Sequence, residues 1–370
     1  MSILQEKIVE KIRKEGPVSF ETFMEMALYY PGLGYYTKEA TRIGKEGDFY
    51  TSPHLHPLFG AMLGRQMEEM WDLLQRPERF RIVEMGAGMG YLARDMLDSL
   101  RERDIFRHID YSIVEMNPAM RERQQQLLAG SGAEVRWFHA LREVGGVTGC
   151  FLSNELLDAF PVRLVEMTDE LIEIFVDVKD DAFVEAGRPA REETAEYCRE
   201  FAPHLPRGYR TEVNLRIREW LHEISAHLRS GFLLTIDYGY TAEEYYSEDR
   251  SRGTLLCYYR HQINENPYRH IGEQDMTAHV NFSSLKRWGA EEGISVGGYC
   301  PQGAYLVALG IDEMIRGRYG ETPDPFELAK IKGLIFPQGM GESHQVMVQY
   351  RGTGTPSLRG FSLRNQAKRV

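Results

Sequence analysis

Three alternate glycines give the sequence its clearest chemical signal. Gly86, Gly88 and Gly90 directly follow the mostly apolar run 81–85, and a helix-like run begins at Tyr91. Glycine adopts positive φ at little cost and lets a ligand approach bare backbone. A strand, a glycine turn and a helix in this order predict a nucleotide-binding corner.

A second strand tip adds a carboxylate. The β-branched and aromatic run 109–114 ends at Glu115, and a helix-like run begins near Ala119. An acid at the tip of the second strand can accept hydrogen bonds from both hydroxyls of a ribose. A strand-end acid beside a helix start would be common by itself. Combined with the glycines at the neighbouring strand tip, it favours a binding site.

The glycine spacing distinguishes between nucleotides. Dinucleotide folds use G-x-G-x-x-G, and Tyr91 stands in the place of its third glycine. The pattern Glu84-x-Gly86-x-Gly88-x-Gly90 instead resembles the first motif of Rossmann-type S-adenosylmethionine-dependent methyltransferases. That ligand has no phosphate. The glycines would let backbone approach its methionine and ribose portions, and Glu84 would meet its ammonium group directly or through water.

Further polar side chains follow two later strands. The run 149–153 leads into Asn154, Glu155 and Asp158, and the run 231–236 ends at Asp237. The carboxyl ends of strands hold ligand and chemistry in open α/β sheets, so these residues are expected at the site. Helix capping is the alternative for Asn154 and Glu155, and it is compatible with a function.

Composition narrows the class of protein. The 370 residues are 42% hydrophobic and 27% charged, which suits one large globular domain with elaborations or two domains. A net charge of -11 argues against a nucleic-acid partner, because phosphate binding needs a basic face. The acidic excess is compatible with a cationic protein substrate, although a solvated acidic surface is the commoner explanation.

No metal site, disulfide or membrane span is expected. Four cysteines lie far apart without a C-x-x-C pair, which predicts reduced, mostly buried thiols. His54 and His56 form the closest histidine pair but lack an evident third ligand. No apolar run approaches the ~18 residues of a membrane helix, and the N-terminus lacks a signal-like core. We therefore expect a soluble cytoplasmic protein.

The order of patterns predicts an α/β architecture with additions. Residues 1–78 form a helical cover with a polar loop, and residues 79–350 form the core. A hairpin at 162–167 and 171–178 opens an insertion of about 160–211, followed by a long helix from Glu212 to Leu228 and a loop region of about 240–282. Residues 351–370 lack the hydrophobic periodicity of a helix or strand, which predicts a flexible tail.

Seven ordered blocks resemble one family, the MidA-like S-adenosylmethionine-dependent methyltransferases, which include a mitochondrial arginine methyltransferase that assists complex I assembly. The blocks lie at residues 30–36, 47–53 with 59–60, 84–90, 153–162, 237–239, 253–255 and 275–282. The resemblance implies a class I methyltransferase sheet of seven strands with an N-terminal helical cover. It also implies a protein substrate, such as a respiratory-complex subunit.

The resemblance assigns residues to the cofactor, S-adenosyl-L-methionine. It implies cofactor contacts from the glycine corner, the two strand-tip acids and the segment before Pro53, and the set is Glu84, Gly86, Ala87, Gly88, Gly90, Glu115, Met116, Asn154, Thr51 and Ser52. Two residues depart from the family pattern. His139 stands where an acid could meet the adenine amine, and Asn281 stands where the family often has Asp.

Methyl transfer needs an acceptor held in line with an electrophilic methyl group, without a metal or covalent nucleophile. We expect the acceptor to be an arginine guanidinium of a protein, gripped by the carboxylates of Glu155 and Asp158, with Asp237 in reserve. Two alternatives stay open: methylation of a small molecule, and an assembly or scaffold protein that binds the cofactor without turnover. An NAD enzyme is disfavoured by Tyr91.

Overall fold

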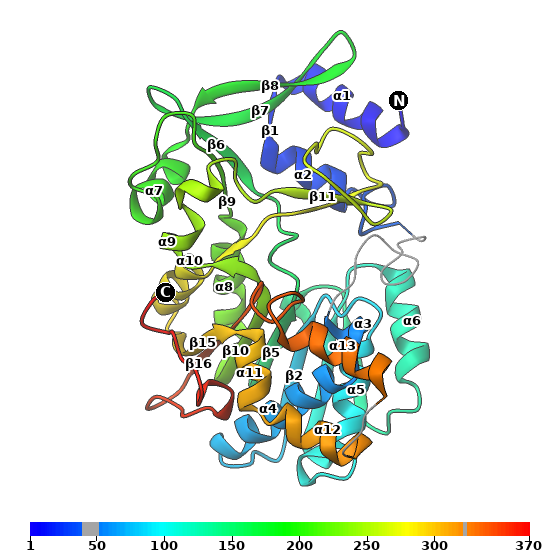
Figure 1. Cartoon of the computed structure of the whole chain (residues 1–370). Coiled ribbons are helices and arrows are strands. Elements are labelled where there is room, and N and C mark those ends of the chain that lie inside the picture. Colours follow the sequence, from blue (N-terminus) through cyan, green and yellow to red (C-terminus); the bar gives the residue numbers. More distant parts are fainter. Residues whose placement is uncertain (39–51, 321–323) are drawn as a thin grey trace. The chain divides into compact units, whose positions relative to one another are not determined.

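The computed structural model describes residues 1–38, 52–320 and 324–370, and the chain divides into two compact units. The core unit contains Tyr50–Leu156, Trp220–Gly239 and Leu285–Val370. The N-terminal unit contains Met1–Phe49, Leu157–Glu219 and Tyr240–Ser284. Figure 1 shows the chain and labels many of its elements.

The sheet of the core unit contains a path of seven strands, in the order β15-β16-β10-β5-β2-β3-β4 among the described residues. The strands β4, β3, β2, β5 and β10 are parallel, and β16 is antiparallel to β10 and β15. This arrangement confirms the predicted α/β sheet. The bounds are β2 (Phe80–Met85), β3 (Ile109–Val114), β4 (Glu134–Phe138), β5 (Val147–Asn154), β10 (Leu228–Tyr240), β15 (Ser295–Pro301) and β16 (His344–Arg351).

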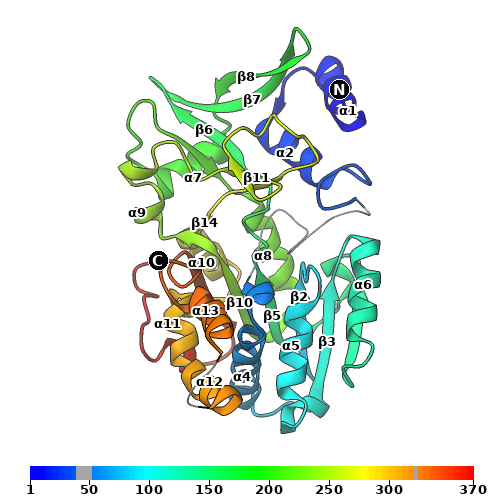
Figure 2. The ribbon, with the colours of Figure 1, turned by 45° about the vertical axis from the view of Figure 1, so that its right-hand side comes forward.

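Helices pack on this sheet through apolar side chains. In Figure 2, α4 (Leu58–Leu73) and α5 (Tyr91–Leu100) lie in front of the strands. They approach closely because α4 has glycines on this side: a Cβ on Gly60 would lie 2.7 Å from Asp95 Cβ. Other elements in the core unit are α3 (Ser52–Leu55), η1 (Asp104–His108), α6 (Pro118–Leu128), η2 (Leu141–Glu143), α11 (Gln302–Ala308), α12 (Ile311–Tyr319), α13 (Pro325–Ile335) and η4 (Arg359–Phe361). Two helices run from one unit's residues into the other's: α8 (Arg216–His227) and α10 (Phe282–Glu291).

The C-terminal segment was expected to be a flexible tail, and that prediction is wrong. Leu358 and Phe361 are buried in the same apolar cluster as the sheet and α4. Phe361 fits because Gly298 has no side chain: a Cβ there would lie 2.2 Å from the Phe361 ring. The segment therefore completes the core, which a scan for helical or strand periodicity could not reveal.

The N-terminal unit contains two small sheets. One has the order β1-β7-β6-β9 with β8 paired to β7, and the other has the order β12-β11-β13. The hairpin expected at 162–178 is confirmed by the antiparallel pairing of β6 and β7. The elements are α1 (Ile3–Glu15), β1 (Val18–Ser19), α2 (Phe20–Tyr29), β6 (Arg163–Met167), β7 (Leu171–Lys179), β8 (Ala182–Pro189), α7 (Glu192–Phe201), β9 (Arg210–Val213), α9 (Ala242–Tyr245), η3 (Glu248–Arg250), β11 (Leu256–Tyr259), β12 (Gln262–Asn264), β13 (Asp275–Thr277) and β14 (Val280–Asn281).

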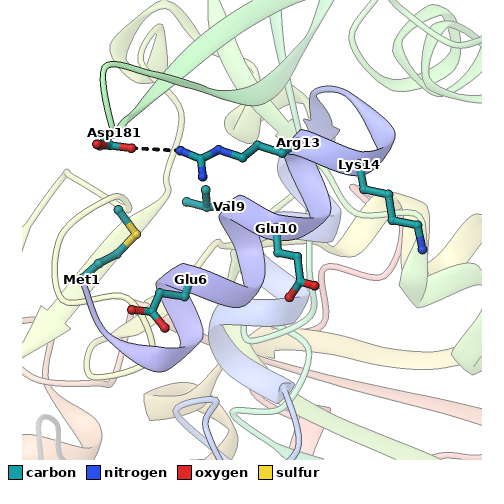
Figure 3. Close-up of a pocket in the computed structure, with 7 residues that line it drawn as sticks. All are labelled: Met1, Glu6, Val9, Glu10, Arg13, Lys14 and Asp181. Atoms are coloured by element: carbon teal, nitrogen blue, oxygen red, sulfur yellow. Dashed lines mark hydrogen bonds and ion pairs between the residues drawn. The ribbon is translucent and has the colours of Figure 1, made fainter.

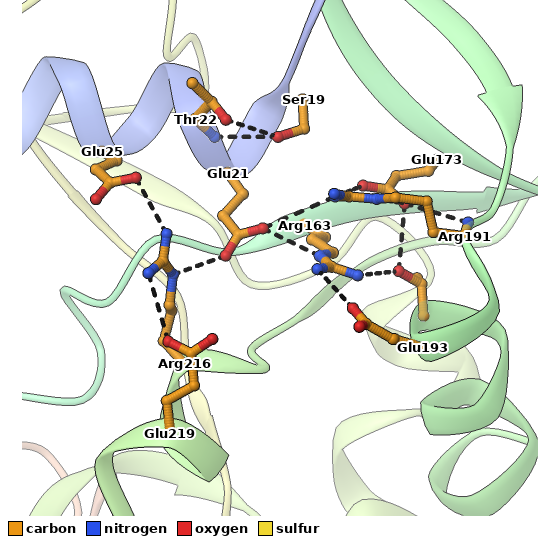
Figure 4. Close-up of polar contacts among 11 residues, drawn as sticks. Ser19, Glu21, Thr22, Glu25, Arg163, Glu173, Arg191, Glu193, Arg216 and Glu219 are labelled. Atoms are coloured by element: carbon orange, nitrogen blue, oxygen red, sulfur yellow. Dashed lines mark hydrogen bonds and ion pairs between the residues drawn. The ribbon is translucent and has the colours of Figure 1, made fainter. Parts of the chain in front are cut away.

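An arginine and glutamate network joins separate segments of the N-terminal unit (Figure 4). Glu21 on α2 accepts from Arg163 Nε at 3.0 Å and from Arg216 Nε at 2.7 Å. Arg191 Nε donates to Glu173, which is fully buried, at 3.1 Å. Arg163, Glu21 and Glu173 are largely buried, so their charges depend on these partners. The network thereby links α2 to β6, β7 and the start of α8.

The unit boundaries differ from the predicted ranges. Residues 1–38 share a unit with the insertion, whereas α4 belongs to the core unit, so the predicted cover of residues 1–78 is divided. The predicted helix beginning at Glu212 is also wrong at its start. Glu212 lies on β9, where its buried carboxylate accepts from the backbone N–H groups of Thr254 and Leu255, and α8 begins at Arg216.

Candidate active site

The glycine corner lies at the carboxyl end of β2. Gly86, Gly88 and Gly90 have φ values of +68°, +52° and +81°, a region that other residues rarely adopt. Gly86 N donates to Val114 O at 3.1 Å, which ties the turn to β3. Gly90 is the left-handed N-cap of α5. All three glycines are therefore needed to form the turn from strand to helix.

Glu84 is a buried carboxylate just before this turn. Tyr111 donates its hydroxyl to Glu84 Oε2 at 2.8 Å, and the glutamate is only 3% exposed. Burial raises the pKa of Glu84 to about 7, an effect that the Tyr111 hydrogen bond opposes. A cationic partner strongly stabilises the ionised form of a buried carboxyl group whose pKa is raised.

Glu115 and the glycine corner are joined by Gln124, a residue that the sequence did not single out. Gln124 Nε2 donates to Gly88 O at 2.8 Å and to Glu115 Oε2 at 3.0 Å. Trp137 Nε1 donates to Gln124 Oε1 at 3.0 Å, and Asn117 N donates to Glu115 Oε1 at 2.8 Å. Burial raises the pKa of Glu115. Gln124 thus fixes the second strand-tip carboxylate relative to the glycine turn.

The turn after β5 lies beside the same corner. Glu155 has a φ of +50°, and its N–H donates to Ile236 O at 2.8 Å. A Cβ on Gly86 would lie 3.0 Å from Leu156 Cδ1, so this turn packs directly on the glycine corner. A non-glycine residue with this φ stores strain, which is typical of functional sites.

The carboxylate of Glu155 is anchored through one oxygen. Ser52 N donates to Oε1 at 3.3 Å, Asn154 Nδ2 donates to it at 3.2 Å, and His344 Nε2 lies 3.6 Å away. The Glu155 side chain is 5% exposed. Within the described parts of the chain, no hydrogen-bond donor reaches Oε2. One oxygen is therefore fixed by the protein while the other is available to a ligand.

Ser52 and Asp237 position this turn. Ser52 Oγ donates to Gln302 Oε1 at 3.1 Å, so its hydroxyl is used within the protein. Asp237 Oδ2 accepts from Leu156 N at 3.1 Å, and Oδ1 accepts from Tyr238 N at 2.9 Å. The predicted cofactor contact of Ser52 and the predicted catalytic role of Asp237 stay predictions.

The predicted roles of Asp158, Met116 and Thr51 stay predictions. Asp158 belongs to the N-terminal unit, where it is buried and its carbonyl accepts from Ala278 N at 2.9 Å. Met116 is 46% exposed beside Glu115. Thr51 lies outside the described residues. The structure brings together Glu84, Gly86, Ala87, Gly88, Gly90, Glu115, Asn154, Glu155, Ser52 and Asp237 within the core unit.

The two departures from the family pattern have local partners. Asn281 Oδ1 accepts from Ser283 N at 3.0 Å and caps α10, and its Nδ2 donates to Tyr197 Oη at 2.8 Å. An amide can both accept and donate, whereas an ionised carboxylate only accepts, so Asp at this position would need Tyr197 to be the donor. His139 is exposed, and its backbone N–H donates to Glu143 at 3.0 Å.

Other features of the described residues are less suggestive of chemistry. A surface groove beside α1 is lined by charges of both signs, with Arg13 paired to Asp181 at 3.0 Å (Figure 3). No cluster suited to a metal ion occurs among the described residues. The helices in these parts of the chain are all too short or too polar to cross a membrane. The four cysteines are buried free thiols, as expected.

Known proteins are similar to this chain over nearly its whole length. A solved structure from Burkholderia thailandensis, bound to S-adenosyl-homocysteine, is 33% identical with a TM-score of 0.91, and the match covers 99% of this chain and 96% of that one. A native structure from the same organism gives a TM-score of 0.88 at the same identity and coverage. The mitochondrial protein arginine methyltransferase NDUFAF7 of Bos taurus is 29% identical over 90% of this chain and 80% of its own length.

A family model supports the same assignment. The family described as "Putative S-adenosyl-L-methionine-dependent methyltransferase" matches residues 62–300, which include the glycine corner, Glu115 and the turn after β5. The resemblance stated from the sequence is thereby confirmed. The chain belongs to this family of S-adenosyl-L-methionine-dependent methyltransferases.

Proposed function

We propose that this S-adenosyl-L-methionine-dependent methyltransferase modifies a guanidinium nitrogen of an arginine in a protein substrate. The single observation that carries the proposal is the geometry of Glu155, a strained and nearly buried carboxylate with one oxygen fixed and the other open. Relatives that cover most of the chain are named protein arginine methyltransferases. From the family resemblance, we extend the proposal to a respiratory-complex subunit as the substrate. From the sequence, we extend it to a cytoplasmic location.

The core unit contains groups that fit the cofactor. The positive φ values at the glycine corner leave bare backbone for close approach, and Glu84 offers a buried carboxylate to an ammonium group. Glu115, held by Gln124, offers a second carboxylate to the ribose hydroxyls. Bound S-adenosylmethionine supplies a methyl group that is already electrophilic, so the protein needs mainly to orient the acceptor and exclude water.

Glu155 would supply both orientation and proton transfer. A guanidinium is planar, and a carboxylate oxygen at a fixed position accepts its N–H in one direction. Methyl transfer forms an N–C bond, breaks the S–C bond with its electrons left on sulfur, and releases one proton from the guanidinium. Glu155 Oε2 would take that proton, because Oε1 already accepts from Ser52 N and Asn154 Nδ2.

Replacing Glu155 with Gln tests this role. The amide keeps the shape of the side chain but loses the charge that attracts the guanidinium and the capacity to accept its proton. We expect kcat for labelled methyl transfer into protein to fall by roughly 100-fold, a typical loss for an acid–base group. Binding of S-adenosylhomocysteine should change by less than about threefold, since the corner contacts remain.

Glu102→Gln is the matched control, because Glu102 is exposed in the same unit. It should leave both transfer and binding unchanged. Transfer by Glu155→Gln at the wild-type rate would remove Glu155 from the mechanism. Lost cofactor binding in that variant would instead assign Glu155 to the cofactor.

A further inference from the structure

The buried, titratable side chain of His344 faces Glu155. His344 is the first residue of β16 and is fully buried. Its ring centroid lies 4.0 Å from that of Tyr238, its partner in the β10–β16 ladder. Nδ1 lies 3.1 Å from Ser343 Oγ, and Nε2 lies 3.6 Å from Glu155 Oε1.

The surroundings of His344 show which atom can be a hydrogen-bond partner for its Nε2. Within the described chain, Nε2 makes no hydrogen bond inside the ordinary distance limit, although it is buried. A buried polar atom is expensive to leave without a partner. The acidic side chain that it approaches is Glu155, and the other titratable group against the ring is Tyr238. Glu155 Oε1 is thus the atom toward which Nε2 is directed.

We propose that His344 is a positioning residue for Glu155. Nε2–H points toward Glu155 Oε1, while Nδ1 accepts from the Ser343 hydroxyl. Oε1 then faces three donors from three segments of the core unit, namely α3, the end of β5 and β16. Fixing Oε1 also fixes the direction of the lone pairs on Oε2.

This inference rests on the proposed function, in which Oε2 orients the guanidinium and takes its proton. Each methyl transfer releases one proton, which passes to Oε2 and then to solvent. His344 does not touch the acceptor in this scheme. Its contribution is to keep the carboxylate from rotating, so that the reacting nitrogen meets the methyl group in a productive orientation.

The contact between His344 and Glu155 can be measured without turnover. Histidine is labelled with ¹⁵N in the full chain, and the His344 signal is assigned from its loss in His344→Gln. In Glu155→Gln the Nε2 resonance of His344 should move by several ppm, because the facing charge is removed. Glu102→Gln should leave it in place. An unchanged His344 resonance in Glu155→Gln would overturn the proposal.

Kinetics then test whether the contact matters. His344→Leu removes the donor, and kcat should fall by roughly tenfold with KM for S-adenosylmethionine unchanged. His344→Gln places an amide donor near the position of Nε2 and should recover most of that loss. A folded His344→Leu with kcat within about twofold of wild type would overturn the proposal, as would an equal loss in both variants.

The two assays separate this inference from the proposed function. A shifted His344 resonance without arginine methylation by the wild type would overturn the function and support the positioning contact. Arginine methylation by the wild type and equally by His344→Leu would support the function and overturn the positioning role. Thermal unfolding of each variant shows whether a loss of activity comes from a loss of fold.

Discussion

Replacing Gly86 with valine is expected to weaken S-adenosylhomocysteine binding by roughly 100-fold. Gly86 has a φ of +68°, which a β-branched residue adopts only with strain, and its Cβ would lie 3.0 Å from Leu156 Cδ1. The substitution therefore distorts both the glycine turn and the neighbouring turn that carries Glu155. Calorimetric titration with S-adenosylhomocysteine measures the loss.

Gly130→Val is the matched control for this substitution. Gly130 has an ordinary φ, and a Cβ there would meet nothing within 4 Å. This variant should bind like the wild type, and thermal unfolding shows whether either variant is folded. Binding by Gly86→Val within about threefold of the wild type would place the cofactor away from this corner.

Binding of S-adenosylhomocysteine is expected to strengthen roughly tenfold from about pH 6 to about pH 8. Burial raises the pKa of Glu84 to about 7, so the carboxyl group is largely protonated at the lower pH. The ammonium group of the ligand favours the ionised form, which lowers the pKa in the complex. Binding below the free-state pKa must therefore release a proton.

The sign of this linkage is open to direct measurement. Calorimetry at about pH 6 in buffers of different ionisation enthalpy should show release of close to one proton per ligand. Glu84→Gln should bind more weakly and lose most of the pH dependence. Glu115, whose pKa is also raised by burial, is a second carboxyl group that can contribute to any dependence that stays in this variant. Proton uptake on binding would contradict the assignment of Glu84 to the ammonium group.

Glu84 also has a consequence for stability. A carboxyl group with a raised pKa in the folded state binds its proton more tightly there than in the unfolded chain. The free energy of unfolding of the ligand-free protein should therefore decline as pH rises from the ordinary glutamate value, 4.5, toward 7. Ligand binding opposes this decline, because the ammonium group of the ligand pairs with the ionised carboxylate of Glu84.

The parts of the site that the sequence could predict are those coded by local pattern. The strand before Gly86, the acid at Glu115 and the polar turn after β5 each combine a strand with a distinctive tip, so their shared edge follows from parallel strand geometry. The start of α2 is coded in the same local way, because the side chain of its N-cap Ser19 accepts from Thr22 N. These features depend on neighbours in the sequence.

The parts that escaped prediction depend on contacts between distant segments. Gln124 is one of three consecutive glutamines, and only the packing of α6 decides which of them is buried. His344 opens a strand whose register places it beside Tyr238 and Glu155. Phe361 belongs to a segment without periodicity, yet it fills the space left by Gly298. The local sequence of each segment gives no indication of the contact that the segment makes.

Methyl transfer to arginine is tested most directly by identifying the residue that becomes methylated. The wild-type protein and Gly86→Val are incubated with methyl-labelled S-adenosylmethionine and cell extract, and labelled protein is hydrolysed for amino-acid analysis. We expect label in methylarginine with the wild type and none with Gly86→Val. Label confined to small molecules, or to another amino acid, would contradict transfer to arginine while leaving the cofactor corner intact.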